Sequence, residues 1–383
     1  MQNLFLYIFL IVLSTASEKT DEVIVENVGG NSINYELYAP LEPKYFPVKY
    51  VNVVIHVFRN NDGSEGFPEN EETKNWLINN YLGNANFVMA HLYPMRLESQ
   101  SAYIEDSRIK YKLLALYFHN DSLGWDMSPK AGANIFSWTL GNELYQKYVI
   151  NNPTNAGGEN AVHIFLGENL KGKGMASGIG DKRWVIHAGV YEFYKEGNFW
   201  TPSGGLRHEL AHSLGLIHTW NSNDGCDDTP LNSGCWNGDD CSNNMLDYNA
   251  SKGALTVCQL GRAHYYLSGK AGNIYDAVEK DFCRKENDNF NIEIAENDTV
   301  VLSAIHFLKG NIHILKNAQL IVTGEVSIPE NAEIMIEDEG KLVVDGGKIF
   351  NACGLNWSGI TGIGSRNVEL KNGGSLQNLQ SDK

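Results

Sequence analysis

Residues 208–218 read HELAHSLGLIH, the pattern H-E-x-x-H-x-x-G-x-x-H with every fixed position filled. His208 and His212 are four residues apart, so one face of a helix presents both imidazoles to the same ion. Gly215 can adopt a positive φ, which ends the helix and brings His218 round as a third ligand. Three neutral histidines leave one position of a zinc ion open for water, as in catalytic zinc sites. The stretch therefore predicts one catalytic zinc ion held by His208, His212 and His218.

Glu209 supplies the acid–base group that such a zinc site needs. It follows the first ligand directly, where its carboxylate can reach a water on the metal. Zinc lowers the pKa of that water to about 7 and polarises the scissile carbonyl. Glu209 can then take the proton of the water and deliver it to the leaving amine. We expect a zinc-dependent metalloendopeptidase with Glu209 as the general base.

The composition fits a globular protein of two domains and disfavours some partners. The chain has 383 residues, of which 43% are hydrophobic, so it can form a substantial core. It carries 46 acidic against 30 basic residues, for a formal net charge of −16, and Lys and Arg form no cluster. Nucleic acids and anionic membranes are therefore poor partners, and the expected partners are protein or peptide substrates.

The first residues have the features of an export signal. An apolar run spans residues 4–13, about half the length of a membrane span, and small residues follow at 14–17. We interpret residues 1–17 as a signal peptide and expect a secreted, extracellular protein with no stable membrane span. Residues 18–48 read as an N-terminal extension or a short pro-segment. No cysteine precedes Cys226, so a prodomain cysteine cannot hold the zinc in this chain.

Residues 49–284 alternate between strand and helix patterns. Predicted strands cover 51–57, 109–118, 161–166 and 183–190, and predicted helices cover 71–90, 134–150, 201–218 and 259–281. Thr201 or Ser203 can cap the third of these helices. The alternation predicts an α/β domain with a twisted, mostly parallel sheet and packed helices. A change in composition marks residues 285–291 as a linker.

Residues 292–383 form a β-rich tail with almost no helical period. NAQLIV from Asn317 is echoed by NAEIMI from Asn331, and Leu320 and Leu342 occupy like places 22 residues apart. A repeat of short strands and turns favours a short parallel β-solenoid. A β-sandwich with accidental similarity is the alternative. Because a solenoid has an open end, the tail is a candidate for binding a surface or another protein.

The residues that follow the zinc motif extend the pattern. They are Thr219-Trp220, Gly225-Cys226, Asp227-Asp228-Thr229-Pro230, Cys241, Asn244, Asp247-Tyr248 and Cys258-Gln259. With the motif, this arrangement resembles the pappalysin (cytophagalysin) family of metzincins, over about 160–270 and more weakly over 50–160, but not in the tail. The resemblance implies a metzincin fold, endopeptidase activity and a methionine-containing turn beneath the zinc.

The methionine turn departs from the family pattern at one position. Family members place Met two residues before the Tyr, whereas Met245 lies three before Tyr248 and Leu246 holds the expected place. The turn residue is a hydrophobic support and not a ligand, so Leu246 or Met245 can fill this role. The resemblance also implies that the Tyr248 hydroxyl donates a hydrogen bond to the developing oxyanion.

The resemblance further implies a calcium site. Some family members bind calcium near the Asp-Asp-Thr-Pro stretch, so Asp227, Asp228 and Thr229 are candidate calcium ligands, with Asp239 and Asp240 as further oxygen donors. A solvated acidic loop is the alternative.

The chain has six cysteines, four of which follow the zinc motif closely. In an exported chain they favour disulfides over a second zinc site, since no C-x-x-C pair is present. The family pairs these four alternately, which implies the disulfides Cys226–Cys241 and Cys235–Cys258. Cys283 and Cys353 either pair with each other or stay free.

Two other functions compete with an active endopeptidase. A surface-binding or adhesive protein could use the protease domain as a scaffold, but the intact Glu209 and histidines favour an enzyme. A zinc-dependent hydrolase of a non-peptide substrate is disfavoured by the extended H-x-x-G-x-x-H form of the motif.

Overall fold

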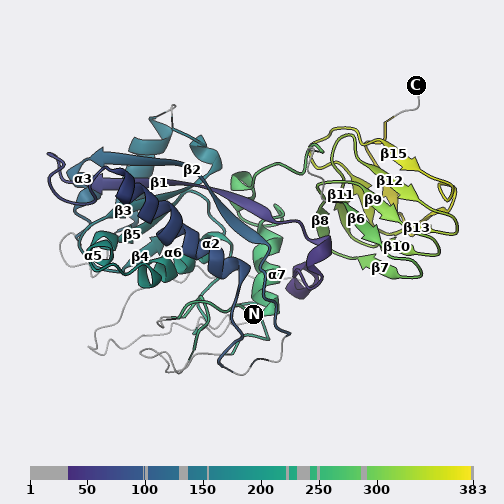
Figure 1. Cartoon of the computed structure of the whole chain (residues 1–383), viewed down its shortest axis with the longest axis horizontal. Helices are drawn as coiled ribbons and strands as arrows, with labels where there is room; N and C mark the ends of the chain where they lie inside the picture. The colour runs from purple at the N-terminus through teal and green to yellow at the C-terminus, as the bar shows by residue number, and fades with distance from the viewer. Residues whose placement is uncertain are drawn as a thin grey trace, which may run out of the picture.

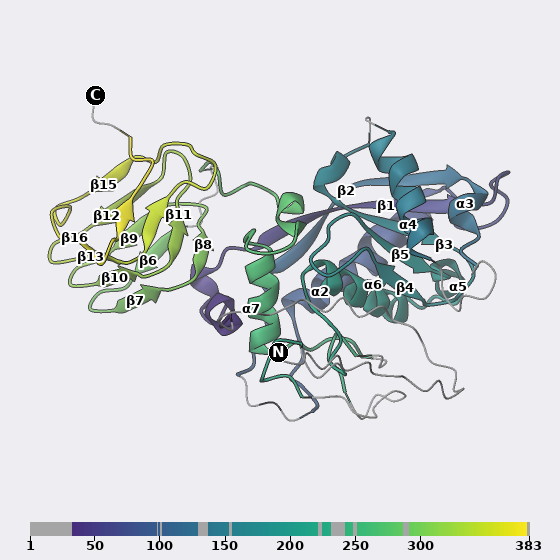
Figure 2. The same ribbon diagram turned by 180° about the vertical axis from the view of Figure 1, so that it is seen from behind.

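The computed structural model describes residues 33–97, 99, 102–128, 137–152, 155–220, 224–230, 242–247, 251–285 and 291–380. Two lobes lie on either side of helix α7 (Val257–Tyr266), as Figure 1 shows. One lobe is a sheet with helices on both faces, and the other is built from short strands (Figures 1 and 2). Within the described ranges, no helix is both long enough and apolar enough to cross a bilayer.

The sheet of the first lobe has five strands. In spatial order these are β2 (Ile109–Asn120), β1 (Lys49–Arg59), β3 (Val162–Gly167), β5 (Trp184–Ala188) and β4 (Gly174–Ala176). The first four are parallel, and β4 pairs antiparallel with β5. The predicted mostly parallel sheet and its four predicted strands are therefore present. β4 was not predicted, because its three residues lie in a glycine-rich stretch without a strand pattern.

Two hydrophobic cores lie on opposite faces of this sheet. β1 lies between β2 and β3, and most of its residues are buried on both faces of the sheet. The larger core is covered by α1 (Glu71–Asn75), the π-helical η3 (Trp76–Leu82), α2 (Gly83–Ala90), α6 (Trp200–Ser213) and α7. The smaller core is covered by α3 (Ser122–Trp125), α4 (Trp138–Tyr145) and the π-helical η4 (Gln146–Ile150). The remaining short elements of the lobe are η5 (Gly158–Asn160), α5 (Val190–Lys195) and η6 (Ile274–Ala277).

Two helices end earlier than the sequence pattern predicts. α6 stops at Ser213 instead of residue 218, because Gly215 turns the chain with φ of 93°. α7 stops at Tyr266 instead of residue 281, and Gly269 follows with φ of 74°. A glycine with positive φ is a common helix terminator. The apolar residues that continue the helical spacing after each glycine therefore lie outside the helix.

The start of α6 also differs from the prediction. The Asn198 side chain accepts a hydrogen bond from the Thr201 backbone N–H at 3.2 Å, so Asn198 performs the capping that we expected from Thr201 or Ser203. The predicted helix over 71–90 is confirmed as the continuous run α1–η3–α2.

Residues 33–48 form a strap that contacts both lobes. The strap contains two short 3-10 turns, η1 (Tyr35–Tyr38) and η2 (Pro43–Tyr45). Tyr35 packs on α7, where a Cβ on Gly261 would lie 2.6 Å from the Tyr35 carbonyl carbon. Tyr45 is 5% exposed and belongs to the core of the β-rich tail. Both ends of the strap are therefore packed against the folded lobes.

The tail contains three parallel sheets of four strands, visited in turn by the chain. The first holds β7 (Thr299–Leu302), β10 (Gln319–Val322), β13 (Lys341–Asp345) and β16 (Val368–Lys371). The second holds β8 (Ile305–Phe307), β11 (Glu325–Ser327), β14 (Lys348–Phe350) and β17 (Ser375–Leu376). The third holds β6 (Ile292–Ile294), β9 (Ile312–Ile314), β12 (Glu333–Ile336) and β15 (Gly359–Thr361).

The register of these sheets confirms the predicted stacking of Leu320 on Leu342. Val300 pairs with Leu320 and Leu342 with Val368, so the circuit lengthens from 20 to 22 to 26 residues. Every strand pair among the described tail residues is parallel, so the antiparallel hairpins of a sandwich are absent there. In the second sheet Phe350 pairs with Ser327.

Alternate apolar residues of the tail strands form its core. Each is 0% exposed; they are Leu320, Val322, Ile334, Ile336, Leu342 and Val344. Left-handed turns at Asn297 and Asn317 stack, and Asn317 Nδ2 donates to Asn297 Oδ1 at 3.2 Å. Asn tolerates this backbone conformation, which explains why the repeat begins with Asn.

The tail is docked on the sheet lobe. Ile305 and Phe307 of β8 belong to the larger core of the sheet lobe, and the Phe307 ring lies 4.5 Å from that of Phe282. Cys283 and Cys353 form a disulfide between the segment that follows η6 and the tail. The two lobes therefore share apolar contacts and a covalent link.

Candidate metal centre

Helix α6 carries His208, Glu209 and His212 close against the sheet. Gly205 lies one turn before Glu209, and a Cβ at this position would be 2.8 Å from His187 Nε2 on β5. A larger residue would push the helix away from the strand. The glycine therefore sets how closely the three functional side chains approach the sheet.

Arg207 fixes the same helix from the opposite direction. Its guanidinium donates to Asn84 Oδ1 on α2 at 3.0 Å and to the Lys252 carbonyl at 3.0 Å. The side chain is 4% exposed, so these bonds replace water and restrain the helix next to the first histidine.

The turn at Gly215 brings the third histidine to the helix. Its N–H donates to the His212 carbonyl at 2.9 Å, and its carbonyl accepts from Arg262 Nε at 2.6 Å. A Cβ at Gly215 would lie 2.7 Å from the Tyr266 ring, so a side chain has no room there. With φ of 93° the chain reverses, and His218 follows three residues later.

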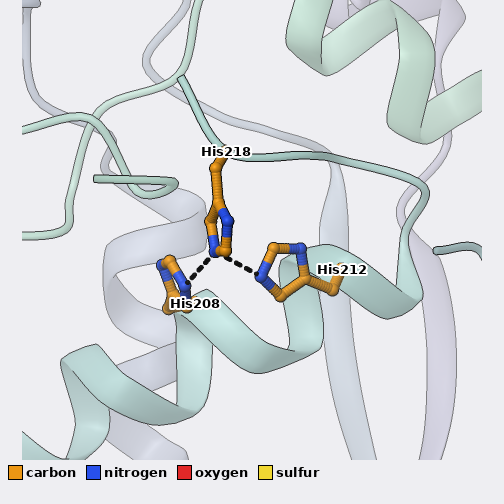
Figure 3. A group of neighbouring side chains, drawn as sticks. All are labelled: His208, His212 and His218. Carbon is orange, nitrogen blue, oxygen red and sulfur yellow. Dashed lines mark hydrogen bonds between the residues drawn. The ribbon is translucent and has the colours of Figure 1, made fainter. Parts of the chain in front are cut away.

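The three imidazoles converge on one point, as Figure 3 shows. His218 Nε2 lies 3.1 Å from His208 Nε2 and 3.1 Å from His212 Nε2. The Nδ1 atoms of His208 and His212 lie 2.8 Å from the Met245 carbonyl and 2.9 Å from the Leu216 carbonyl. A carbonyl only accepts, so both Nδ1 atoms carry the proton and both Nε2 atoms present a lone pair.

Hydrogen bonds among the three Nε2 atoms cannot satisfy all of them. His218 Nε2 can donate one proton at most, so it cannot serve two lone pairs at once. A cation bound to all three nitrogen atoms would satisfy them together, and the Nδ1 bonds to carbonyls hold the tautomer that a metal needs. Burial lowers the pKa of His208 and His218 well below the usual value, which keeps these rings neutral as ligands must be. The donor set fits a zinc ion.

Glu209 lies beside this centre and under β4. It is 8% exposed, and a Cβ on Gly174 would be 2.6 Å from its Cδ, so the carboxylate fills the space over that glycine. Burial raises the pKa of Tyr81 well above its usual value, and the negative charge of Glu209 adds to the shift. Glu209 thus faces the antiparallel edge strand of the sheet and not bulk water.

The turn that contains Met245 and Leu246 contributes both of these apolar side chains to the core. Met245 and Leu246 are 0% exposed and belong to the larger core. The Met245 backbone N–H donates to the Ala254 carbonyl at 2.9 Å, and the Met245 carbonyl holds His208. Both side chains are therefore part of the apolar core, and Met245 also orients a histidine through its main chain.

Several predicted residues fall outside the described part of the chain. They are Tyr248, Cys235, Cys241, Asp239 and Asp240. The predicted role of Tyr248 as an oxyanion donor therefore remains a prediction.

The disulfide pairing implied by the resemblance is wrong. Cys226 pairs with Cys258, with the two Cα atoms 5.5 Å apart, which excludes both Cys226–Cys241 and Cys235–Cys258. The physical reason is the path of residues 224–230 over the first turn of α7. There Asp228 Oδ2 accepts from the Cys258 N–H at 3.0 Å, which brings the two sulfurs together.

The predicted calcium ligands lie at the same helix start. Besides the Cys258 N–H, Asp228 accepts a hydrogen bond from the Thr229 hydroxyl at 3.4 Å. Thr229 Oγ1 also lies 3.2 Å from Thr256 Oγ1. Cys226, Asp228 and Cys258 are close enough to hold a metal, but both sulfurs are used in the disulfide. Calcium at Asp227, Asp228 and Thr229 remains a prediction.

Sequence reasoning missed two contributors to the site. Asp247 is 0% exposed and accepts hydrogen bonds from the Thr219 and Ser242 hydroxyls; its only signal was its place beside Tyr248. Lys252 approaches Glu209 from a loop that carries no motif. Neither position follows from local spacing, because each depends on how distant segments pack.

Comparisons with known proteins give a limited result. No protein-family model matches the chain, and no curated protein matches it. Among solved structures, mirolysin in complex with compound 9 is 16% identical with a TM-score of 0.37, covering 60% of this chain and 96% of that one. Mature mirolysin of Tannerella forsythia in complex with a cleaved peptide is 17% identical with a TM-score of 0.36, covering 60% and 94%. At these scores the function has to be argued from the site itself.

Proposed function

We propose that the protein is a zinc-dependent metalloendopeptidase of the metzincin type, similar to the pappalysins. The observation that carries this proposal is the convergence of the Nε2 atoms of His208, His212 and His218 beside a buried Glu209. Three imidazoles with one adjacent carboxylate form the donor set of a hydrolytic zinc centre, with a position left for water.

Each group then has a distinct task. A zinc ion held by the three histidines supplies Lewis-acid chemistry, which acidifies water and polarises a peptide carbonyl. Glu209 takes a proton from the attacking water and gives it to the leaving amine. Tyr248 is proposed to donate its hydroxyl proton to the developing oxyanion. Met245 and Leu246 keep the floor of the site apolar, which strengthens these electrostatic interactions.

The edge of β4 supports a peptide substrate. β4 is the last strand of the sheet, and Gly174 at its start lies directly over Glu209. An extended peptide can add to the free edge of such a strand through main-chain hydrogen bonds. A peptide bound in this way would have one of its peptide bonds next to the histidines. A small non-peptide substrate would not need a free strand edge for binding.

Further parts of the proposal rest on the sequence. We propose a secreted protein with residues 1–17 as signal peptide, a protease domain over 49–284, and a linker at 285–291. We also propose that the three parallel sheets of residues 292–383 constitute a short β-solenoid that can bind a surface or another protein. Calcium at Asp227, Asp228 and Thr229 is proposed as a structural ion.

Metal analysis combined with peptide cleavage tests the central proposal. The purified wild type is expected to hold one zinc ion per chain and to cleave a peptide library. Glu209→Ala should retain zinc but lose cleavage, because it removes the base and not a ligand. Turnover in Glu209→Ala above about a tenth of wild type would show that another group activates the water. A zinc-loaded wild type without peptidase activity would favour the scaffold function instead.

A further inference from the structure

Lys252 holds a fixed position against the active-site helix. Its carbonyl accepts from Arg207 Nε at 3.0 Å, and its Cβ lies 4.0 Å from the place where a Cβ on Gly204 would be. Both contacts are on α6, within about one turn of His208. The next residue, Gly253, donates its N–H to the Asn243 carbonyl at 2.9 Å, which anchors the loop on its other side.

The Lys252 ammonium lies within electrostatic reach of the reacting groups. The charged groups around it are Glu209, Arg207, Lys173 and Asp247. The side chain is partly buried, so little water separates it from these groups.

Nevertheless, Lys252 forms no ion pair with any carboxylate of the described part of the chain. Asp247 uses its carboxylate on the hydroxyls of Thr219 and Ser242. Glu209 is committed to the proton transfers of the proposed reaction. Among the described residues, this partly buried cation therefore has no ion-pair partner, which is costly unless a ligand supplies one.

A second cation extends the same local charge. Lys173 directly precedes β4, along whose edge the proposed peptide would lie. The whole chain has a formal net charge of −16, so these two lysines place positive charge on an otherwise acidic protein. A positive site on an acidic protein attracts an acidic partner group to this place and not to the rest of the surface.

We propose that Lys252 selects peptide substrates with an acidic side chain next to the scissile bond. The proposal rests on the proposed peptidase function and names its substrate class. A glutamate or aspartate side chain of the peptide, placed beside the Lys252 ammonium, would supply the missing counter-ion. Because the pair forms in a partly desolvated site, it is worth more than an exposed ion pair. We expect at least about a tenfold advantage in kcat/KM over the matching amide side chain.

Cleavage-site profiling of the zinc-loaded protein tests this. One peptide series varies each position around the scissile bond among Glu, Gln and Lys, and it is applied to wild type, Lys252→Glu and Lys371→Glu. Wild type should prefer Glu over Gln at one flanking position, and Lys252→Glu should shift that preference to Lys. Lys371→Glu makes the same charge change on the distant strand β16 and should keep the wild-type profile.

Two outcomes would overturn the proposal while leaving the peptidase function intact. One is a wild type that cleaves the Glu and Gln peptides equally. The other is a Lys252→Glu or Lys252→Met variant that loses activity equally on all peptides, which would mean that Lys252 only balances the charge of Glu209. Absence of cleavage by wild type on every peptide would instead contradict the peptidase proposal.

Binding gives a second measurement if Lys252→Glu does not fold. Zinc-loaded Glu209→Ala, which should bind without cleaving, is titrated with fluorescent Glu and Gln peptides at low and high salt. The Glu peptide should bind about tenfold more tightly at low salt, with the difference shrinking as salt screens the pair. Equal affinity for the two peptides would also overturn the proposal.

Discussion

Asp247 accepts a hydrogen bond from Thr219, the residue that follows the third histidine, His218. Ser242 donates to the second carboxylate oxygen, and Asp247 is 0% exposed. The buried carboxylate therefore joins the segment that carries His218 to the turn that carries Met245. Because Met245 in turn holds His208, one network orients two of the three candidate ligands.

We predict that Asp247→Asn weakens zinc binding by roughly 10- to 100-fold, the usual cost of losing a group that orients metal ligands. The amide keeps the volume of the carboxylate but loses its charge and replaces one accepting oxygen with an NH2 donor, so one of the two hydroxyls must turn from donating to accepting. Competition with a chelator measures the affinity, and circular dichroism checks the fold. Asp276→Asn, an exposed site paired with Lys182, is the control and should retain wild-type affinity. Equal zinc affinity in a folded Asp247→Asn variant would remove Asp247 from the site.

Gly174→Ala is expected to lower turnover without loss of zinc. The new Cβ would lie 2.6 Å from Glu209 Cδ, so the carboxylate must move away from the position it now fills. A displacement of about 1 Å at a catalytic group can cost as much as 100-fold in rate. Gly204→Ala adds the same methyl group on α6, where its nearest neighbour would be Arg207 Nη2 at 3.5 Å, and should have a small effect. Steady-state kinetics with zinc quantification separate the two, and unchanged kcat in Gly174→Ala would show that Glu209 tolerates the shift.

Removal of the tail is expected to destabilise the sheet lobe while leaving the candidate zinc ligands in place. A chain that ends near residue 287 loses Ile305 and Phe307 from the larger core and exposes Phe282. It also loses the Cys283–Cys353 disulfide. Each lost apolar side chain is worth about 1.5–3 kcal/mol, and 1 kcal/mol corresponds to about 2–4 °C in Tm for a lobe of this size.

Thermal unfolding and cleavage of an unstructured peptide check this truncation. The double variant Cys283→Ser/Cys353→Ser removes only the disulfide, so the additional loss in the truncated chain measures the apolar contacts. An unchanged Tm would mean that the lobes are independent. A folded, zinc-loaded truncated enzyme without activity would show that the tail takes part in the chemistry.

Three histidines form a chain across strands β2, β1 and β3, and two of them, His56 and His163, are buried. His56 Nδ1 lies 2.9 Å from His119 Nε2, and His56 Nε2 lies 3.0 Å from His163 Nδ1. His163 Nε2 donates to the Gly158 carbonyl at 2.8 Å, so each neutral ring can donate to the next. Burial lowers the pKa of His119 and of His163 to about 4, and it lowers that of His56 well below its usual value.

This chain predicts an acid-sensitive fold. The unfolded histidines titrate near pH 6.5, so between pH 6.5 and about 4 the unfolded state binds more protons than the folded state. Stability contributed by the neutral chain is therefore fully present above pH 6.5 and falls as the pH drops towards 4. His119→Asn removes one of these groups and should flatten the decline of Tm over that range. Parallel Tm curves for wild type and variant would contradict the prediction.

The sequence by itself determined those features that depend on local spacing. His208, Glu209, His212, Gly215 and His218 are close in the chain, so helix periodicity and one glycine turn place them without reference to the rest of the fold. The stacking of Leu320 on Leu342 likewise follows from a short repeat, because each tail strand pairs with the equivalent strand of the next repeat. The parallel sheet was also predicted from local patterns, namely the alternation of strand and helix segments along the chain.

Tertiary structure alone decided the contacts between segments distant in sequence. The Cys226–Cys258 pairing depends on the path of a loop over α7. The alternate pairing implied by the family resemblance therefore predicted the wrong partners. The positions of Asp247 beside Thr219, of Gly174 over Glu209 and of Lys252 against α6 depend on the packing of separate elements. Spacing carries no information about such contacts, because their geometry is set by the burial of the whole core and not by the neighbours of each residue.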